Sequence, residues 1–172
     1  VILIVTLLRV NAVAPGRVFD FEELGAIRLL DDSATEWHNG ALMNATLNSL
    51  QEGDVFIIPN TTFSIMGGIL VSTKLSKVVF QLDGTLSFSQ NREAWPRSGN
   101  GKVLECISFE NLEDVVFTSS GGHDNRGTLQ GNGKVWWGAI QYLLHQEDRP
   151  RLFHIGQSKN ILFEKIRLIN SP

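Results

Sequence analysis

The sequence contains little cysteine, little proline and no long apolar run. Cys106 is the single cysteine among 172 residues, so no disulfide can form within the chain. Cysteine content therefore does not indicate whether the protein resides in an oxidising or a reducing compartment. The apolar run at residues 1–8 is too short to cross a bilayer, which predicts no membrane span. The net charge of −3 and the lack of a large basic block argue against nucleic-acid binding. Sixteen glycines against five prolines favour a chain of many short strands.

The N-terminal residues have the pattern of a secretory signal. The chain starts with Val rather than Met, which indicates a fragment, and the apolar run is followed by small residues at Ala12–Ala14. Residues 1–14 are therefore interpreted as a truncated signal peptide, with a first β-strand as the alternative. In a secreted chain, the sequons at Asn44 (NAT) and Asn60 (NTT) are candidate N-glycosylation sites.

One helix is predicted, at residues 34–51. Asp32 or Ser33 can cap its start, and Gly53 closes it. The apolar residues at helical spacing predict its buried face; they are Trp37, Ala41, Leu42, Ala45 and Leu50, with Leu47 partly joining them.

Short strands rich in Val, Ile and Phe fill the remainder of the chain. They read VFIIPN, GGILVST, KVVFQLDGTLSF, KVLECISF, DVVFTSS, RLFHIG and NILFEKIRLIN. Three stretches share one plan and end at Phe80, Phe117 and Phe163. Because the spacing of these copies is unequal, stacked coils of a parallel β-helix are favoured over the even blades of a propeller.

The stretch GTLQGNGKVWWG, residues 127–138, resembles a phosphate loop but fails the tests for one. Val135 stands where a P-loop needs a hydroxyl, and Trp136 stands where a dinucleotide fingerprint needs its third glycine. The stretch is interpreted as a turn between strands. Of Trp136 and Trp137, at most one can face a groove, and one is expected to plug the scaffold.

Other polar residues are predicted to have structural roles. Cys106 is expected to be a buried thiol, Asp31–Asp32 to interact with the helix N-terminus, Asp83 to be a turn acid, and GHD at residues 122–124 to form a solvated turn. The four histidines share no metal-binding spacing, so no metal site and no cofactor site are predicted.

Several segments in order resemble the pectin-degrading polygalacturonases, the glycoside hydrolases of family 28. They are DDSATEWHNGALMNATLNSLQEGDVFIIPNTTF, VVFQLDGTL, GTLQGNGKVWWG, RPRLFHI and KNILFEKIRLINSP. The resemblance implies an all-β fold, a right-handed parallel β-helix of the pectin lyase type with an N-terminal capping helix, of which residues 18–172 form the first part. It also implies a secreted, cell-wall-directed protein that is monomeric when complete.

The activity that the resemblance implies is inverting hydrolysis of α-1,4-galacturonide bonds in pectin or polygalacturonate. The catalytic aspartates of this family lie in motifs that follow Asn-Ser-Pro, and the sequence ends at Pro172. No catalytic residue is therefore assigned, and the chain alone is expected to be inactive and prone to aggregation. Two alternatives stay open: a non-catalytic β-helix for adhesion or polysaccharide binding, and a calcium-dependent pectate lyase relative.

Overall fold

The computed structural model describes residues 16–122, 125–137 and 149–172, and the predicted signal peptide lies outside these ranges. In the described part, short strands form three sheets in which every strand pair is parallel. The helices of the described residues are α1 (Ser33–Ser49) and the single turn α2 (Lys134–Trp137).

The three sheets are named A, B and C. Sheet A has the order β1-β2-β6-β9-β12, with β5 also paired to β9; its strands are β1 (Val18–Asp20), β2 (Val55–Ile58), β5 (Leu75–Ser76), β6 (Val79–Leu82), β9 (Leu112–Thr118) and β12 (Lys159–Phe163). Sheet B has the order β13-β10-β7-β3, with β3 (Thr62–Ile65), β7 (Thr85–Phe88), β10 (Gly127–Gln130) and β13 (Ile166–Ile169). Sheet C has the order β11-β8-β4, with β4 (Ile69–Val71), β8 (Ile107–Glu110) and β11 (His154–Gly156).

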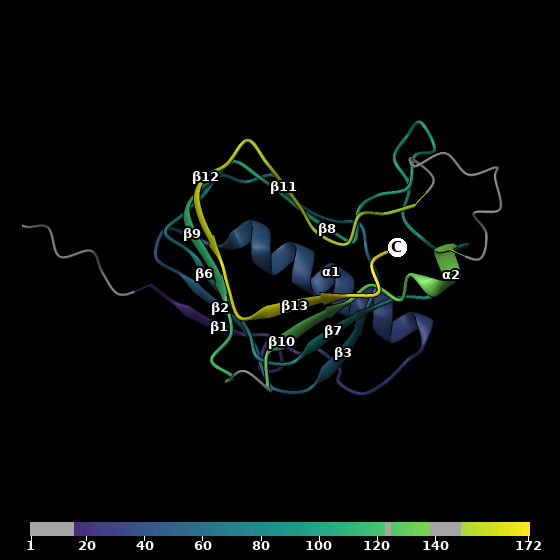
Figure 1. Ribbon diagram of the computed structural model, residues 1–172, viewed down its shortest axis with the longest axis horizontal. Helices are drawn as coiled ribbons and strands as arrows, with labels where there is room; N and C mark the ends of the chain where they lie inside the picture. The colour runs from purple at the N-terminus through teal and green to yellow at the C-terminus, as the bar shows by residue number, and fades with distance from the viewer. Residues whose placement is uncertain (1–15, 123–124, 138–148) are drawn as a thin grey trace, which may run out of the picture.

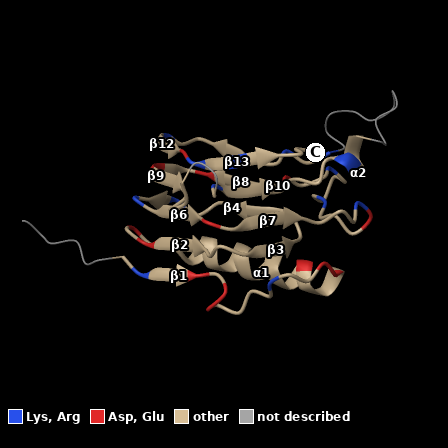
Figure 2. Ribbon diagram, turned by 60° about the horizontal axis from the view of Figure 1, so that its bottom comes forward, with Lys and Arg blue, Asp and Glu red and all other residues tan. Residues whose placement is uncertain are grey.

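The chain visits the sheets in a repeating order. It runs from sheet A to B to C in β2-β3-β4, again in β6-β7-β8 and in β9-β10-β11, and then enters β12 and β13. Figure 1 shows the sheets as sides around a common centre, and Figure 2 shows the coils as layers from β1 to β12 and β13. This arrangement is consistent with a parallel β-helix.

The register confirms the internal repeat that the sequence predicts. Phe56 pairs with Phe80, Phe80 with Phe117, and Phe117 with Phe163, on successive strands of sheet A. The ring centroids of Phe80 and Phe117 are 4.7 Å apart and the rings are stacked. Equivalent residues therefore lie above one another although the connections between them differ in length.

Left-handed backbone conformations stack at the corners of the coils. Lys77, Asp114 and Asn160 occupy equivalent positions on β5/β6, β9 and β12 and have φ values of 53°, 55° and 55°. Asn111 and Gln157 form a second such pair, with φ of 60° and 47°. Asn and Asp tolerate this region better than other residues with a side chain, and they supply three of these five corners.

Helix α1 is found where the sequence predicts it, but only part of its predicted apolar face is buried: Leu47 and Leu50 are buried, and Leu42 is partly so. Trp37 is 44% exposed, and Ala41 and Ala45 are also exposed. The buried side combines Met43 and Leu47 with small and polar residues, namely Thr35, Glu36, Asn39, Gly40 and Thr46. Apolar periodicity misleads here because this helix packs on strand edges, where backbone groups need polar partners.

Three asparagines of α1 bond to the edge strands β3 and β4. Asn39 donates to the carbonyl oxygens of Ile27 and Ser64 and accepts from the N–H of Ile27. Asn44 accepts from the N–H of Leu70 on β4, and Asn48 donates to the carbonyl oxygen of Leu70. The helix thus occupies the side of β3 and β4 on which no further strand pairs within the described residues.

The strands differ from the sequence prediction in two places. Residues 62–65 form β3, which is not among the predicted strands. KVVFQLDGTLSF forms two strands, β6 and β7, separated by a turn at Asp83–Gly84, where the sequence predicts a turn acid. Residues 127–130, interpreted as a turn, form strand β10 between β7 and β13. Strand β10 begins at Gly127, where an added Cβ would lie 1.8 Å from the carbonyl oxygen of Leu82. The sequence favours a turn because glycines are common where a chain bends. Gly127 is instead needed because the backbone of β10 packs closely against that of Leu82.

Candidate functional site

The outer face of sheet B presents polar side chains in register. Along these strands Phe63, Leu86 and Leu129 are buried at aligned positions, so the residue before each faces outward. Those outward positions form the row Thr62, Thr85, Thr128 and Arg167, one from each of β3, β7, β10 and β13. Arg167 lies over Thr128, with its Nε 3.3 Å from the Thr128 Oγ1.

A polar groove of about 350 Å³ lies beside this row, where the chain enters sheet B. Its volume lies within the range of small-ligand pockets, about 300–1,000 Å³. We call it the sheet B groove; it is lined by Leu29, Asn60, Thr61, Thr62, Asp83, Gly84, Thr85, Asn125, Arg126 and Arg167.

Asp83, the carboxylate in the described part of the lining, is held by three donors. Gln81 Nε2 donates to Oδ2 at 2.6 Å, and the Ser119 hydroxyl and the Ser120 N–H donate to Oδ1 at 3.1 and 2.6 Å. Burial opposes ionisation, but these hydrogen bonds outweigh it and hold the pKa of Asp83 below its ordinary value. Asp83 is therefore a fixed anion, unsuited to act as a proton donor. Its position in the β6–β7 turn confirms the predicted turn acid.

Arg126 and Arg167 give the groove its chemical character. Guanidinium groups bind carboxylates through paired, charge-assisted hydrogen bonds. The side chains of Asn60, Thr62 and Thr85 add neutral donors and acceptors of the kind that sugar hydroxyls use. The described lining can thus hold an acidic sugar, with two cations against one hydrogen-bonded carboxylate.

The helix-capping and thiol predictions are confirmed. Asp32 accepts from the N–H groups of Ala34 and Thr35, which together with the Thr35 hydroxyl hold the pKa of Asp32 below its ordinary value. Cys106 is fully buried, and burial raises the pKa of its thiol well above the ordinary value. A thiol in that state is a poor nucleophile.

The tryptophan pair divides as predicted. Trp136 is 1% exposed and packs edge-on against Trp95, with ring centroids 5.3 Å apart. Trp137 is 46% exposed, and its Nε1 donates to the carbonyl oxygen of Ser171 at 2.8 Å. Neither indole lines the sheet B groove, so the pair joins parts of the scaffold.

The described histidines have local partners. His38 Nε2 lies 3.0 Å from the carbonyl oxygen of Gly25. His154 Nδ1 lies 3.1 Å from the Ser108 hydroxyl and 3.8 Å from a Glu110 carboxylate oxygen. Since one nitrogen makes both contacts, the imidazole does not bridge the hydroxyl and the carboxylate as a nucleophile-activating histidine does. His123, Asp124 and His145 lie outside the described residues.

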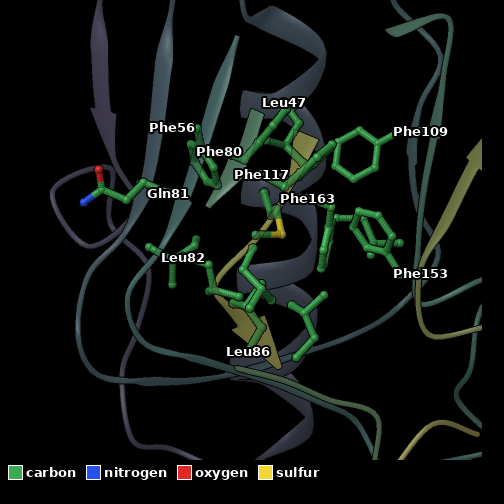
Figure 3. Close-up of a pocket in the computed structure, with 15 residues that line it drawn as sticks. Leu47, Phe56, Phe80, Gln81, Leu82, Leu86, Phe109, Phe117, Phe153 and Phe163 are labelled. Atoms are coloured by element: carbon green, nitrogen blue, oxygen red, sulfur yellow. The ribbon is translucent and has the colours of Figure 1, made fainter. Parts of the chain in front are cut away.

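The interior of the coils is apolar. Its cavity is lined almost wholly by hydrocarbon and aromatic groups from α1 and all three sheets, including Leu47, Phe80, Phe109, Phe117 and Phe163 (Figure 3). Such a space supplies no proton donor or nucleophile, so it is not a candidate site.

Arg126 and Arg167 were missed in the reading of the sequence, although a signal for the groove was present. TFSI, TLSF and TLQG each begin with Thr, followed by a large apolar residue and then Ser or Gln. Aligning these three stretches would have placed their threonines in one row. The arginines carry no such pattern, and only the register brings Arg167 beside Thr128.

Within the described residues, no cluster of three or more His, Cys, Asp or Glu side chains could hold a metal ion. No helix in the same part of the chain is long and apolar enough to cross a membrane.

In comparisons with known proteins, the chain is distantly similar to several proteins that are named as galacturonan hydrolases. No family model matches the chain. It is 28% identical over 130 residues to a probable endo-xylogalacturonan hydrolase A of Aspergillus oryzae, covering 73% of the chain and 29% of that protein. It is 27% identical over 143 residues to exopolygalacturonase B of Aspergillus niger, covering 78% and 28%. A probable polygalacturonase of Vitis vinifera is 29% identical over 102 residues, covering 52% and 20%. The chain thus spans less than a third of the length of these relatives.

Proposed function

We propose that the protein is a polygalacturonase-type glycoside hydrolase that acts on pectin, and that this chain forms the first coils of its fold. The observation that carries the proposal is the similarity, over as much as 78% of the chain, to proteins named as galacturonan hydrolases. The stacked parallel strands support the proposal because they offer a long outer face on which a polymer can lie. A secreted, cell-wall-directed and monomeric protein fits the same function.

The fold in this proposal is a right-handed parallel β-helix whose N-terminal end is capped by α1. The hydrogen bonds from Asn39, Asn44 and Asn48 to strand-edge backbone support the cap. So does the N–H of Met66, which donates to the carbonyl oxygen of Glu36 at 2.8 Å. A helix that satisfies these groups prevents another strand from pairing at that edge.

In this proposal the sheet B groove binds the polymer and the catalytic carboxyl groups lie in later coils. Inverting hydrolysis needs a carboxylic acid and a carboxylate about 6.5–9.5 Å apart, so that a water molecule fits between. The described groove lining has one carboxylate, Asp83, and its hydrogen bonds favour the ionised form. Arg126 and Arg167 would bind galacturonate carboxylates, and this chain alone would bind substrate without cleaving it.

The deciding experiment is an assay of the complete protein on polygalacturonate. New reducing ends without unsaturated products, formed equally with and without a calcium chelator, are the expected result. Proton NMR of the first products should show inverted anomeric configuration. Unsaturated, calcium-dependent products would replace the proposal with a lyase. Binding without cleavage by the complete protein would replace it with an adhesion or polysaccharide-binding function.

A further inference from the structure

The two sequons lie in very different surroundings. Asn44 is inside α1, and its Oδ1 accepts the N–H of Leu70 at 2.9 Å. Asn48 donates to the Asn44 carbonyl oxygen at 2.9 Å and lies within 3.5 Å of its Oδ1. A glycan on this half-buried amide would stand between α1 and β4, where the helix covers the strand edge.

Asn60 instead projects from a turn. Residues 59–61 connect β2 to β3, while the equivalent connection in the next coil is residues 83–84. Gly84 packs closely against this longer turn, since an added Cβ on Gly84 would lie 2.1 Å from the carbonyl oxygen of Thr61. Asn60 is exposed, and its amide makes no hydrogen bond with a described residue.

We infer that Asn60, and not Asn44, carries an N-linked glycan, and that this glycan stands at the mouth of the sheet B groove. The inference rests on the proposed function in requiring passage through the secretory pathway, and its consequence for binding rests on the proposal that the groove binds the polymer. The amide nitrogen of Asn60 forms a bond to the anomeric carbon of the first sugar of a polyprenyl-pyrophosphate-linked oligosaccharide. The bond from that carbon to the pyrophosphate breaks, the pyrophosphate leaves with the electron pair, and the amide proton is released.

The position of Asn60 gives the glycan a consequence for binding. Asn60 lines the same groove as Arg126 and Arg167. A bulky, hydrated glycan rooted there covers one approach to the two cations. Glycosylation at Asn60 therefore weakens the access of a polymer to the groove, because it covers the approach and takes up the Asn60 amide, while Arg126 and Arg167 stay unchanged.

Glycopeptide mapping tests the site. The chain is produced in yeast behind a cleavable leader and digested, and its glycans are removed enzymatically in heavy-oxygen water, which labels each formerly occupied Asn. The label is expected on Asn60 and absent from Asn44. Asn60→Gln should abolish the glycan mass, and Asn44→Gln should leave it unchanged. Glycan on Asn44, or on neither site, would overturn the inference, and chain retained inside the cell can be mapped in the same way.

A relocated glycan tests the consequence. Asn60→Gln combined with Leu162→Thr moves the sequon to Asn160, on exposed β12 of sheet A, and Asp114→Gly removes the acceptor that holds the Asn160 amide at 2.9 Å. Binding to immobilised polygalacturonate is expected to be several-fold weaker with the full glycan at Asn60 than after an endoglycosidase trims it to its first sugar, which leaves residue 60 an uncharged amide. With the glycan at Asn160, trimming should change nothing. If trimming the glycan changes binding equally at Asn60 and at Asn160, the glycan at Asn60 does not act by covering the groove. Neither readout depends on hydrolysis, so a failure here is distinguishable from a failure of the proposed function.

Discussion

Phe117 lies at the centre of the aromatic core. Its side chain is 3% exposed, stacks on Phe80 and contacts Phe109, Phe153 and Phe163 edge-on or at a tilt. Each contact comes from another strand or coil, so this one ring links neighbouring coils and two of the sheets. Its contribution to stability should accordingly be large.

Phe117→Ala is expected to lower the free energy of unfolding by about 3–5 kcal/mol, because it removes a buried ring and leaves a cavity between packed coils. Urea denaturation followed by tryptophan fluorescence measures the change. Leu162→Ala, at a position 49% exposed, is the control and should change stability by no more than about 0.5 kcal/mol. A similarly small effect of Phe117→Ala would mean that the coils do not depend on this ring.

Glu113 predicts a pH dependence of stability. Lys159 and Lys74 lie 2.7 and 2.9 Å from its carboxylate oxygens and lower its pKa from 4.5 to about 2. Because the folded-state pKa is the lower one, these contacts stabilise the fold above pH 4.5, and the effect is lost as the pH falls toward 2. Glu113→Gln should therefore lower Tm at neutral pH and leave it unchanged near pH 2. High salt should reduce the difference at neutral pH.

The exposed residue Glu23 provides the matched control for Glu113. It joins no ion pair among the described residues, so Glu23→Gln should leave the pH profile of Tm unaltered. If Glu113→Gln behaves in the same way, the contacts with the two lysines do not contribute to stability.

At the scale of elements, α1 acts through its polar side chains. Asn39 is completely buried, and its three hydrogen bonds satisfy backbone groups of two different segments. Gly40 follows it, and an added Cβ there would lie 2.8 Å from the carbonyl oxygen of Met66. The helix therefore docks through close approach and amide pairing as much as through Met43 and Leu47.

Asn39→Ala is expected to destabilise the chain by about 1–3 kcal/mol for each buried group left without a partner. Limited proteolysis should at the same time show faster cleavage in residues 22–32, which lose their bond to the helix. Asn100→Ala, in an exposed turn, is the control. Unchanged stability in the Asn39 variant would contradict the edge-covering role of α1.

Local signals in the sequence predicted much at this scale. The helix was predicted within a few residues because its cap and its period are local, and most strands were found because they are short apolar runs. Strand β3 was missed because Thr62 and Ser64 make it look polar, although the register brings it beside β7. The sheet B groove could not be predicted in the same way, because Asn60, Asp83, Arg126 and Arg167 come from different coils and meet only through stacking.

At the scale of the whole molecule, the two ends of the stack differ. Phe63, Leu86, Leu129 and Leu168 occupy one row of sheet B, and their exposed fractions are 0%, 3%, 4% and 48%. Leu168 thus has an interior position that no described coil covers. At the other edge of sheet B, Phe63 is completely buried, and α1 bonds to β3 through Asn39.

Leu168→Lys is expected to reduce self-association of the isolated chain, because a charge on β13 discourages edge-to-edge pairing. Size-exclusion chromatography with light scattering should show a larger monomer fraction than for the parent chain. Leu30→Lys, at a position 51% exposed away from this edge, should not have that effect. If the parent chain is already monodisperse, the predicted aggregation is wrong.

The row of phenylalanines in sheet A also limits how such a gene can change its length. Gain or loss of one residue inside a strand would turn every later side chain of that strand to the opposite face. Gain or loss of a whole coil keeps each phenylalanine above its equivalent, and the unequal connections after Phe80 and Phe117 show that loops vary without disturbing this order. In related sequences, tolerated insertions and deletions are thus expected to comprise complete coils or loop segments. Insertions or deletions of a single residue within a strand should be rare.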